Sequence, residues 1–342
     1  MRDAALDDRP DSVDEAPPPT AVDVERALEQ HRVELTAYCY RMLGSPFDAE
    51  DAVQETLVRA WKAADRFEGR SSIRSWLYRI ATNVCLDVLG GTQRRVRPMD
   101  LGGASTPDAF TGATRPDGAW VLPAPDGRVV ESADDPAEQV VSRESVRLAF
   151  VAALQHLPAR QRAVLILREV LRWKADEVAE LLGTTVASVN SALQRARATM
   201  DTIDPATCDT VDPDDPAQRE LLSRFLEAFE AYDVDALLTL MRDDVVQSMP
   251  PYDFWLQGRD AIKAWYLGEG IECSGSRLVP TAASGMPAFG QYRPSGPGGR
   301  HEPWSLTVLE IADGQVVHVN SFLDTAALFP LFGLPSHPDD AA

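Results

Sequence analysis

Residues 173–197, WKADEVAELLGTTVASVNSALQRAR, contain two short helical patterns that meet at a glycine. The apolar residues of the first pattern recur at i, i+3, i+4 and i+7: Ala175, Val178, Ala179 and Leu182. Gly183 then supplies the left-handed position that a helix C-terminus favours, and Thr184 or Thr185 can cap the next helix. These features predict a helix-turn-helix.

The second helix has an apolar arc and a polar arc at 100° per residue. The apolar arc consists of Val186, Val189, Leu193 and Ala196, and the polar arc with its flanks consists of Ser188, Asn190, Ser191, Gln194, Arg195 and Arg197. Gln, Asn and Arg reach base edges in a major groove, whereas Ser and Arg reach phosphates. Helix–Gly–helix pairs with polar outer faces also occur in proteins that never contact DNA, so the rest of the chain must decide.

The net charge of −20 argues against nucleic-acid binding until it is divided along the chain. Residues 26–97 carry +3 and residues 142–200 carry +4, whereas 1–25, 98–141 and 201–342 carry −6, −6 and −15. Two basic islands in an acidic chain are candidate phosphate-facing modules.

The 342 residues suggest two or three domains. The chain has no apolar run of about 18 residues, and its first residues are acidic and Pro-rich, which predicts a cytoplasmic protein with no membrane contact. The four cysteines are far apart and have no His at metal spacing, so we expect no disulfide framework, no metal site and no cofactor.

Residues 1–24 predict a disordered leader, and residues 25–97 a helical domain. Apolar spacing indicates helices from residue 24 to 42, from 48 to 63 and from 73 to 89, with Trp61 in the core and Trp76 undecided. In the second helix, Asp51, Gln54 and Glu55 form an exposed face.

Residues 48–61 read DAEDAVQETLVRAW and residues 67–83 read FEGRSSIRSWLYRIATN. These motifs resemble domain 2 of the sigma-70 family of transcription initiation factors, in its compact extracytoplasmic-function (ECF) type. The resemblance implies that Asp51, Gln54 and Glu55 bind core RNA polymerase. Without the flanking motif, such an acidic face would be read as merely solvated.

The same resemblance implies that a polar loop and the helix after it read the unwound minus-ten element of promoter DNA. The residues concerned are Gly69, Arg70, Ser71, Ser72, Arg79 and Asn83. A small polar pocket suits a flipped base, and Arg74, Arg94, Arg95 and Arg97 could meet backbone phosphates. The arginines at 94–97 could equally be a charge cluster at a helix end.

Residues 98–137 are rich in Gly, Pro and acidic residues, which predicts a long linker. In ECF factors a linker at this place threads the RNA path of the polymerase, and for any single residue here a solvated tether is nearly as good an interpretation. Residues 138–200 contain LPARQRAVLILREV at 157–170 and then the helix-turn-helix. This pattern resembles sigma domain 4, which implies that Asn190, Ser191, Gln194 and Arg195 face minus-thirty-five bases while Ser188 and Arg197 hold phosphates.

A second acidic linker at 201–217 precedes a domain at 218–335. Helical patterns come first and are followed by alternating strands at 277–284, 286–293, 304–311 and 315–323, with Asp313-Gly314 as a hairpin turn. This order resembles the SnoaL-like, NTF2-type cone. The expected fold is thus multidomain, with two all-α sigma domains followed by an α+β cone, as in the actinobacterial SigG-like group of ECF factors.

Some cone-fold relatives are enzymes that use a carboxylate or His in an apolar pocket. The candidates here are Asp253, His318, Asp324 and Glu310, each of which also has an ordinary structural interpretation. Since fold does not imply function, we expect a regulatory or ligand-sensing domain and no catalytic residues.

We therefore expect a sigma factor controlled by its own C-terminal domain. The alternatives are a metabolite-responsive DNA-binding regulator and a DNA-binding module fused to a small-molecule enzyme, but neither needs the motifs at 48–83. The acidic C-terminal domain would either mask the faces of Arg79 or Arg197 or hold the two basic modules at a working spacing. A pocket ligand and a separate anti-sigma protein remain open.

Overall fold

The computed structural model describes residues 21–67, 71–116, 118–131, 135–203 and 215–340. The predicted leader up to residue 20, most of the second acidic linker, and the candidate DNA-binding residues Gly69 and Arg70 lie outside the described residues. Of the helices in the described ranges, none combines the length and apolar character needed to span a membrane.

The N-terminal module is a bundle of α1 (Ala21–Leu43), α2 (Pro46–Ala63) and α3 (Ile73–Gly91). Ser45 caps α2 by accepting the Asp48 N–H at 3.2 Å, and Ser72 caps α3. The core prediction for Trp61 was wrong, because its side chain is 62% exposed. Trp61 follows buried Ala60 and is therefore turned about 100° from the face that meets α1 and α3. Trp76 is half-buried and contacts Phe67.

The second helical module contains five helices that follow one another closely. They are α5 (Pro136–Glu144), α6 (Leu148–Gln155), α7 (Ala159–Leu165) with a wider turn of helix at Ile166–Val170, α8 (Ala175–Leu181) and α9 (Val186–Met200). Gly183 has φ +61° and Thr185 caps α9, as expected for a helix-turn-helix. Val186, predicted in the apolar arc, is instead 43% exposed, because it begins α9 one turn before buried Val189.

The C-terminal domain wraps a curved sheet around helices. It contains α10 (Pro216–Glu230), α11 (Val234–Thr239), β1 (Met241–Ser248), β2 (Trp255–Gln257), α12 (Arg259–Leu267), β3 (Arg277–Ala283), β4 (Met286–Arg293), β5 (Glu302–Ala312), β6 (Gln315–Phe322) and α13 (Thr325–Leu331). The strand order is β2-β1-β6-β5-β4-β3, with β1 and β6 parallel and the other neighbours antiparallel.

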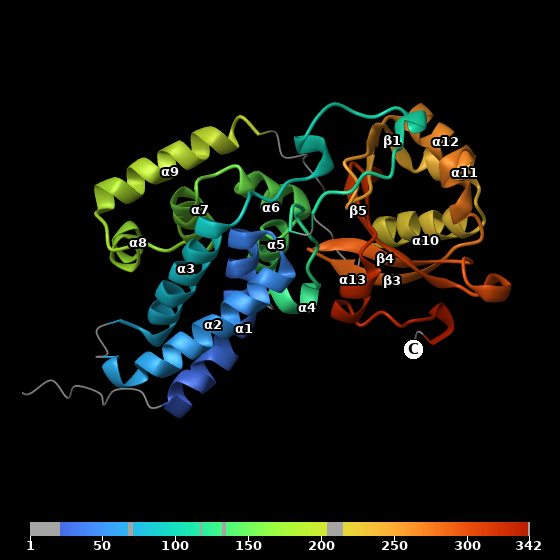
Figure 1. The fold of residues 1–342 in the computed structure, drawn as a ribbon. Helices are drawn as coiled ribbons and strands as arrows, with labels where there is room; N and C mark the ends of the chain where they lie inside the picture. Colours follow the sequence, from blue (N-terminus) through green and yellow to red (C-terminus); the bar gives the residue numbers. More distant parts are fainter. Residues whose placement is uncertain (1–20, 68–70, 117, 132–134, 204–214, 341–342) are drawn as a thin grey trace, which may run out of the picture.

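The two faces of this sheet belong to different apolar clusters. On one face α10, α11 and α12 cover residues such as Leu309 and Val319, while α13 covers the other face near Val308 (Figure 1). The second face belongs to the same apolar cluster as the helical modules. Both two-residue turns of the antiparallel strands, Ser284-Gly285 and Asp313-Gly314, have positive φ at each position, as a tight hairpin requires.

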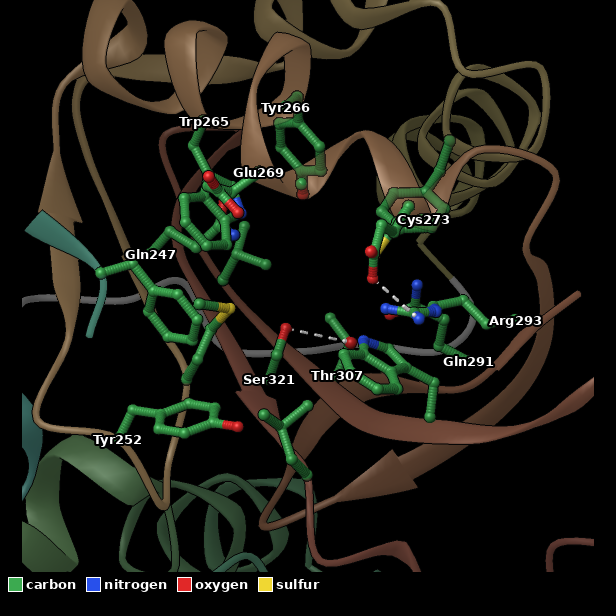
Figure 2. A pocket seen from close by; sticks show the side chains of 18 residues that line it. Gln247, Tyr252, Trp265, Tyr266, Glu269, Cys273, Gln291, Arg293, Thr307 and Ser321 are labelled. Carbon is green, nitrogen blue, oxygen red and sulfur yellow. Dashed lines mark hydrogen bonds and ion pairs between the residues drawn. The ribbon is translucent and has the colours of Figure 1, made fainter. Parts of the chain in front are cut away.

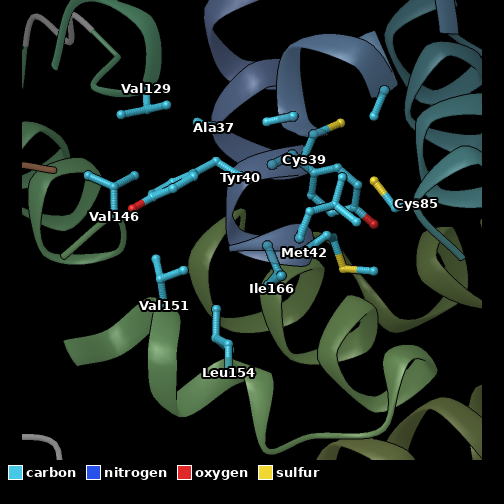
Figure 3. Packing of buried hydrophobic residues seen from close by; sticks show 14 of the residues in the cluster. Ala37, Cys39, Tyr40, Met42, Cys85, Val129, Val146, Val151, Leu154 and Ile166 are labelled. Carbon is cyan, nitrogen blue, oxygen red and sulfur yellow. The ribbon is translucent and has the colours of Figure 1, made fainter. Parts of the chain in front are cut away.

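The segment between the two helical modules differs from the irregular tether that its composition predicts. Trp120, Val121 and Ala124 are buried, and the short helix α4 (Asp126–Val129) follows them. The segment runs along the C-terminal domain, where the N–H groups of Ser105 and Arg115 donate to backbone carbonyls. Figure 3 shows how Val129 joins Tyr40 and Val146, so one apolar core joins α1, the linker and the second module. Burial of a few apolar side chains thus orders a segment of polar composition.

Candidate promoter-binding surfaces and a cavity in the C-terminal domain

The predicted polymerase-binding face lies on the solvent side of α2. Asp51, Gln54 and Glu55 are exposed, while the intervening Val53 is buried against the bundle. Glu55 accepts from Arg59 at 2.7 Å, and Arg59 also reaches Asp87 on α3 at 2.9 Å. The face is therefore acidic and accessible, and its shape is set by a regular helix.

The predicted minus-ten residues that the structure describes lie at the start and along one side of α3. Ser72 and Asn83 are exposed, and Ser71 is half-buried. Arg74 is held by Glu34 at 2.6 Å and lies 5.5 Å from the Trp173 ring of the second module, so its partly exposed side chain already has partners within the protein. Arg79 is partly exposed and points away from the bundle core to a partner in the second module.

That partner is Glu180 on α8, the first helix of the helix-turn-helix. Arg79 Nη2 lies 3.3 Å from Glu180 Oε1 and donates to the Glu180 carbonyl at 3.2 Å. Next to it, the rings of Tyr78 and Trp173 are 5.0 Å apart. The side of α3 that carries the predicted minus-ten residue Arg79 therefore lies directly against the second module.

Two buried arginines also join the helical modules. Arg41 of α1 donates to Ser145 Oγ at 2.7 Å, and Arg162 of α7 donates to the Met42 carbonyl. Burial lowers the pKa of Arg162 to about 10, which reflects how completely its guanidinium is removed from water. Arg95 likewise turns inward and binds Asp48 at 2.6 Å. Arg94 remains exposed and contacts His156 at the surface, at 3.1 Å.

All six predicted minus-thirty-five residues are exposed on α9: Ser188, Asn190, Ser191, Gln194, Arg195 and Arg197. Arg195 Nη1 donates to Ser191 Oγ at 2.7 Å, so these two side chains are aligned one turn apart. Arg197 pairs with Glu169 at 2.6 Å. The helix therefore presents one continuous polar face, while Val189 and Leu193 hold it to the module.

The C-terminal domain encloses a cavity of about 300 Å³ between the sheet and α12 (Figure 2). Aromatic and apolar side chains form most of its wall: Phe110, Phe229, Met249, Tyr252, Trp265, Tyr266, Trp304, Val319 and Leu323. Its polar groups include Gln247, Glu269, Glu272, Cys273, Gln291, Arg293, Thr307 and Ser321. Arg293 forms an ion pair with Glu272 at 3.0 Å, which leaves Glu269 as the second carboxylate of the described lining. Burial raises the pKa of the Cys273 thiol.

The four residues considered for catalysis are absent from the described lining of this cavity. Asp253 is exposed and pairs with Arg115 at 2.6 Å, and Asp324 caps α13. Glu310 accepts from Asn320 at 3.1 Å and lies 3.0 Å from His318, in a polar cluster elsewhere on the sheet. Strand alternation placed His318 correctly on a strand, but the face that His318 and Glu310 occupy depends on bulges such as the register shift after Glu310.

Comparison with known proteins identifies each module. Residues 27–95 match the family model of Sigma-70 region 2, residues 147–200 that of Sigma-70 region 4, and residues 222–319 that of the SnoaL-like domain. The chain is 48% identical to ECF RNA polymerase sigma factor SigG of Mycobacterium tuberculosis over 92% of this chain and 84% of the relative. It belongs to the ECF family of RNA polymerase sigma factors.

A second relative, ECF RNA polymerase sigma factor SigJ of Mycobacterium tuberculosis, is 30% identical over 85% of this chain and 87% of its own length. The crystal structure of SigJ superposes with a TM-score of 0.59 at 24% identity and covers 92% of this chain and 100% of that one. The predicted fold, two helical sigma domains followed by an α+β cone, is therefore confirmed.

The sigma domains and the cone meet at the Ser284-Gly285 turn between β3 and β4, which we call the docking turn. The Ser284 N–H donates to the Ala124 carbonyl at 2.7 Å, and its hydroxyl accepts the Ala124 N–H at 3.0 Å. The Gly285 N–H donates to Asp126 Oδ1 at 2.7 Å. Sequence reasoning missed this contact, and the only local signal was the Ser-Gly pair between two strand patterns.

Proposed function

We propose that this sigma factor binds core RNA polymerase through Asp51, Gln54 and Glu55 and reads the minus-ten and minus-thirty-five elements through α3 and α9. We further propose that its C-terminal domain holds the sigma domains in a closed arrangement that cannot use both elements at once. The pairing of Arg79 with Glu180, at 3.3 Å, carries this proposal.

The two promoter elements are separated by roughly 25 base pairs, or about 85 Å of duplex at 3.4 Å per base pair. In the closed arrangement the minus-ten side of α3 contacts the first helix of the helix-turn-helix. Engagement of both elements therefore requires the domains to separate. The free energy that holds the linker and the sigma domains in the closed arrangement must be overcome before both elements are bound. It therefore weakens promoter binding by the same amount.

The docking turn supports a restraining role for the C-terminal domain. It is hydrogen-bonded to Ala124 and Asp126 of the linker, and the buried Ser284 hydroxyl contacts Tyr40 of α1. The contacts are buried, hydrogen-bonded and apolar, whereas the charge distribution predicted an acidic domain held by surface arginines. We therefore expect docking to depend only weakly on salt, since buried contacts are screened much less than exposed charges.

A noncatalytic role for the cone is part of this proposal. Asp253, His318, Asp324 and Glu310 were the sequence's candidates for proton transfer, and their contacts place them in ion pairs, a cap and a polar cluster. The cavity, lined by aromatic and apolar side chains with a few polar groups, suits binding of a small molecule.

Gly285→Ala in the full chain tests the restraint. Gly285 has φ +71°, and a Cβ there would lie 2.7 Å from the Arg143 carbonyl of α5. We expect the variant to undock the turn, bind core polymerase more tightly and transcribe more from a cognate promoter. Gly314→Ala is the matched control, because it has φ +68° but open space around the new Cβ.

Both variants carry similar backbone strain, so a difference between them reports the clash at the docking turn. An expanded radius of gyration by small-angle scattering, seen only for Gly285→Ala, would show that docking is lost. Unchanged or reduced transcription by an undocked Gly285→Ala protein would refute the restraint.

A further inference from the structure

One wall of the cone cavity comes from outside the cone. Phe110, in the linker between sigma domains 2 and 4, lines the cavity beside residues of β1, α12 and the loop after β1. Its ring makes edge contacts with Tyr252 at 5.0 Å, Phe254 at 5.3 Å and Trp265 at 5.3 Å. Figure 2 shows Tyr252 and Trp265 on the same side of the open space. The cavity is therefore complete only while the linker is docked.

The cavity also contains a buried polar group whose hydrogen-bonding capacity is unused. Gln247 of β1 is 4% exposed, and its Oε1 has no hydrogen-bond partner among the described residues. By contrast, the side chain of Gln291, on the opposite side of the cavity in Figure 2, donates to Ser276 Oγ and accepts from Ser305 Oγ. A buried acceptor without a partner is costly, so a ligand that donates to Gln247 would gain the full value of that bond.

The charges around the cavity restrict the ligand further. Arg293 is paired with Glu272 and stacked on Trp304 at 3.7 Å. The second acidic residue of the lining, Glu269, is exposed to solvent and has no cationic partner among the described residues. An anionic ligand would meet this negative charge. A neutral ligand avoids that cost, and the aromatic walls favour a ring system. The volume of about 300 Å³ lies at the small end of ligand sites.

We propose that the cavity binds a small neutral aromatic molecule bearing a hydroxyl group. The hydroxyl bonds to Gln247, and the ring lies against Phe110. The space exists with Phe110 in place, so the ligand occupies the cavity beside this ring. Because an undocked linker removes that wall, the ligand binds the docked state more tightly and stabilises it. The expected effect of the ligand on transcription is inhibition. This effect rests on the proposed function above, whereas the binding itself does not.

Calorimetric titration of the full chain with beta-naphthol and with its methyl ether tests the ligand class. Beta-naphthol has a two-ring aromatic body and one hydroxyl, and the ether lacks only the donor. We expect beta-naphthol to bind wild type roughly two- to tenfold more tightly than the ether. Gln247→Leu should bind both probes about equally. No binding of either probe, or equal binding of both by wild type, would overturn the ligand class.

Phe110→Ala tests the part played by the linker. We expect beta-naphthol affinity to fall roughly two- to tenfold in Phe110→Ala. Leu101→Ala removes another apolar side chain from the same linker but does not line the cavity, so it should bind like wild type. Matching far-ultraviolet circular dichroism and melting curves would show that both variants fold. Unchanged affinity in folded Phe110→Ala would overturn the linker's role.

Hydrogen exchange measures the reciprocal effect without relying on affinity. The Ser105 N–H donates to the Trp255 carbonyl at 2.8 Å and the Arg115 N–H to the Pro251 carbonyl at 3.1 Å, so both amides report linker docking. Saturating beta-naphthol should slow their exchange in wild type and in Leu101→Ala. Unchanged or faster exchange at saturation would overturn the coupling. Slowed exchange with no effect on transcription would leave this inference intact and count against the restraint proposed above.

Discussion

The hydroxyl groups of Tyr40 and Ser284 lie 2.9 Å apart in the protein interior, although 244 positions separate them in the chain. Tyr40 donates to the Leu122 carbonyl at 2.8 Å, and Ser284 Oγ accepts the Ala124 N–H at 3.0 Å. Sigma domain 2, the linker and the cone therefore meet at one hydrogen-bonded point. Burial raises the pKa of Tyr40 far above its ordinary value, so the phenol stays protonated and able to donate.

Tyr40→Phe should loosen docking of the cone while leaving sigma domain 2 folded. The change leaves Ser284 and the Leu122 carbonyl short of a partner, which costs about 1–3 kcal/mol. Hydrogen exchange of the linker amides should quicken accordingly. Tyr38→Phe is the control, because the Tyr38 hydroxyl binds Thr82 within the bundle, at 2.8 Å. Equal linker exchange in the two variants would contradict the role of Tyr40.

Glu180→Ala should expose Arg79 and modestly increase binding of single-stranded minus-ten DNA. The pair is 41% and 66% exposed, so it contributes at most about 1 kcal/mol. The gain should be seen at low salt by fluorescence anisotropy and fade as salt rises. Arg79→Ala should lower DNA binding in the same assay. A DNA affinity independent of residue 79 would remove it from the minus-ten surface.

Asp51→Ala combined with Gln54→Ala should abolish binding to core polymerase. Both side chains are exposed on α2, so helix content by circular dichroism should remain that of wild type. Lys62→Ala, in the last turn of the same helix, should bind normally. Pull-down with purified core enzyme measures the effect. Normal core binding by the double variant would mean that the polymerase-binding surface lies elsewhere than on this part of α2.

Gln194→Ala and Arg195→Ala should each weaken binding of minus-thirty-five duplex by about 1–3 kcal/mol if the contacts are to base edges. Leu193→Ala should act differently, because Leu193 is 6% exposed and its truncation should cost about 2–5 kcal/mol of domain stability. Footprinting measures the loss of DNA binding, and thermal melting measures the loss of domain stability. Wild-type footprints from the 194 and 195 variants would mean that another face of α9 reads DNA.

Docking should strengthen on acidification through Asp126. Burial raises the pKa of this carboxyl, an effect that the Gly285 N–H and Arg143 partly oppose. Because the pKa of Asp126 is raised in the docked state, protonation of this carboxyl favours docking. The stabilisation is complete below about pH 4, the ordinary pKa of Asp, and is lost as pH rises through the raised pKa. Asp126→Asn keeps the acceptor for Gly285 and should abolish this part of the pH dependence. Hydrogen exchange of the linker amides, corrected for the pH dependence of intrinsic exchange, measures the strength of docking. An identical pH profile in wild type and Asp126→Asn would show that Asp126 does not contribute to the pH dependence of docking.

Local patterns in the sequence were sufficient for most elements and for most positions on α2 and α9, although Trp61 and Val186 are exposed where the apolar pattern predicted burial. Gly183 ends the first helix of the helix-turn-helix, Thr185 caps the second, and Asp313-Gly314 forms a hairpin turn. These features could be predicted from the sequence because each depends only on the backbone of neighbouring residues. Helical periodicity placed Gln194 and Arg195 on the exposed side because a single helix has one apolar stripe. The family motifs at 48–83 and 157–170 led to the prediction of a sigma factor.

Only the tertiary structure decided which of these faces are free and where the domains meet. Arg74 and Arg95 looked like phosphate ligands, but Glu34 and Asp48, distant in the chain, hold them. Phe110 sits in a stretch of Gly, Pro and Asp that has no periodicity, yet it completes a cavity in another domain. Such contacts depend on the relative placement of elements that lie from 40 to 155 positions apart in the chain. That placement is set by the summed burial of apolar side chains, which leaves no local repeat in the sequence.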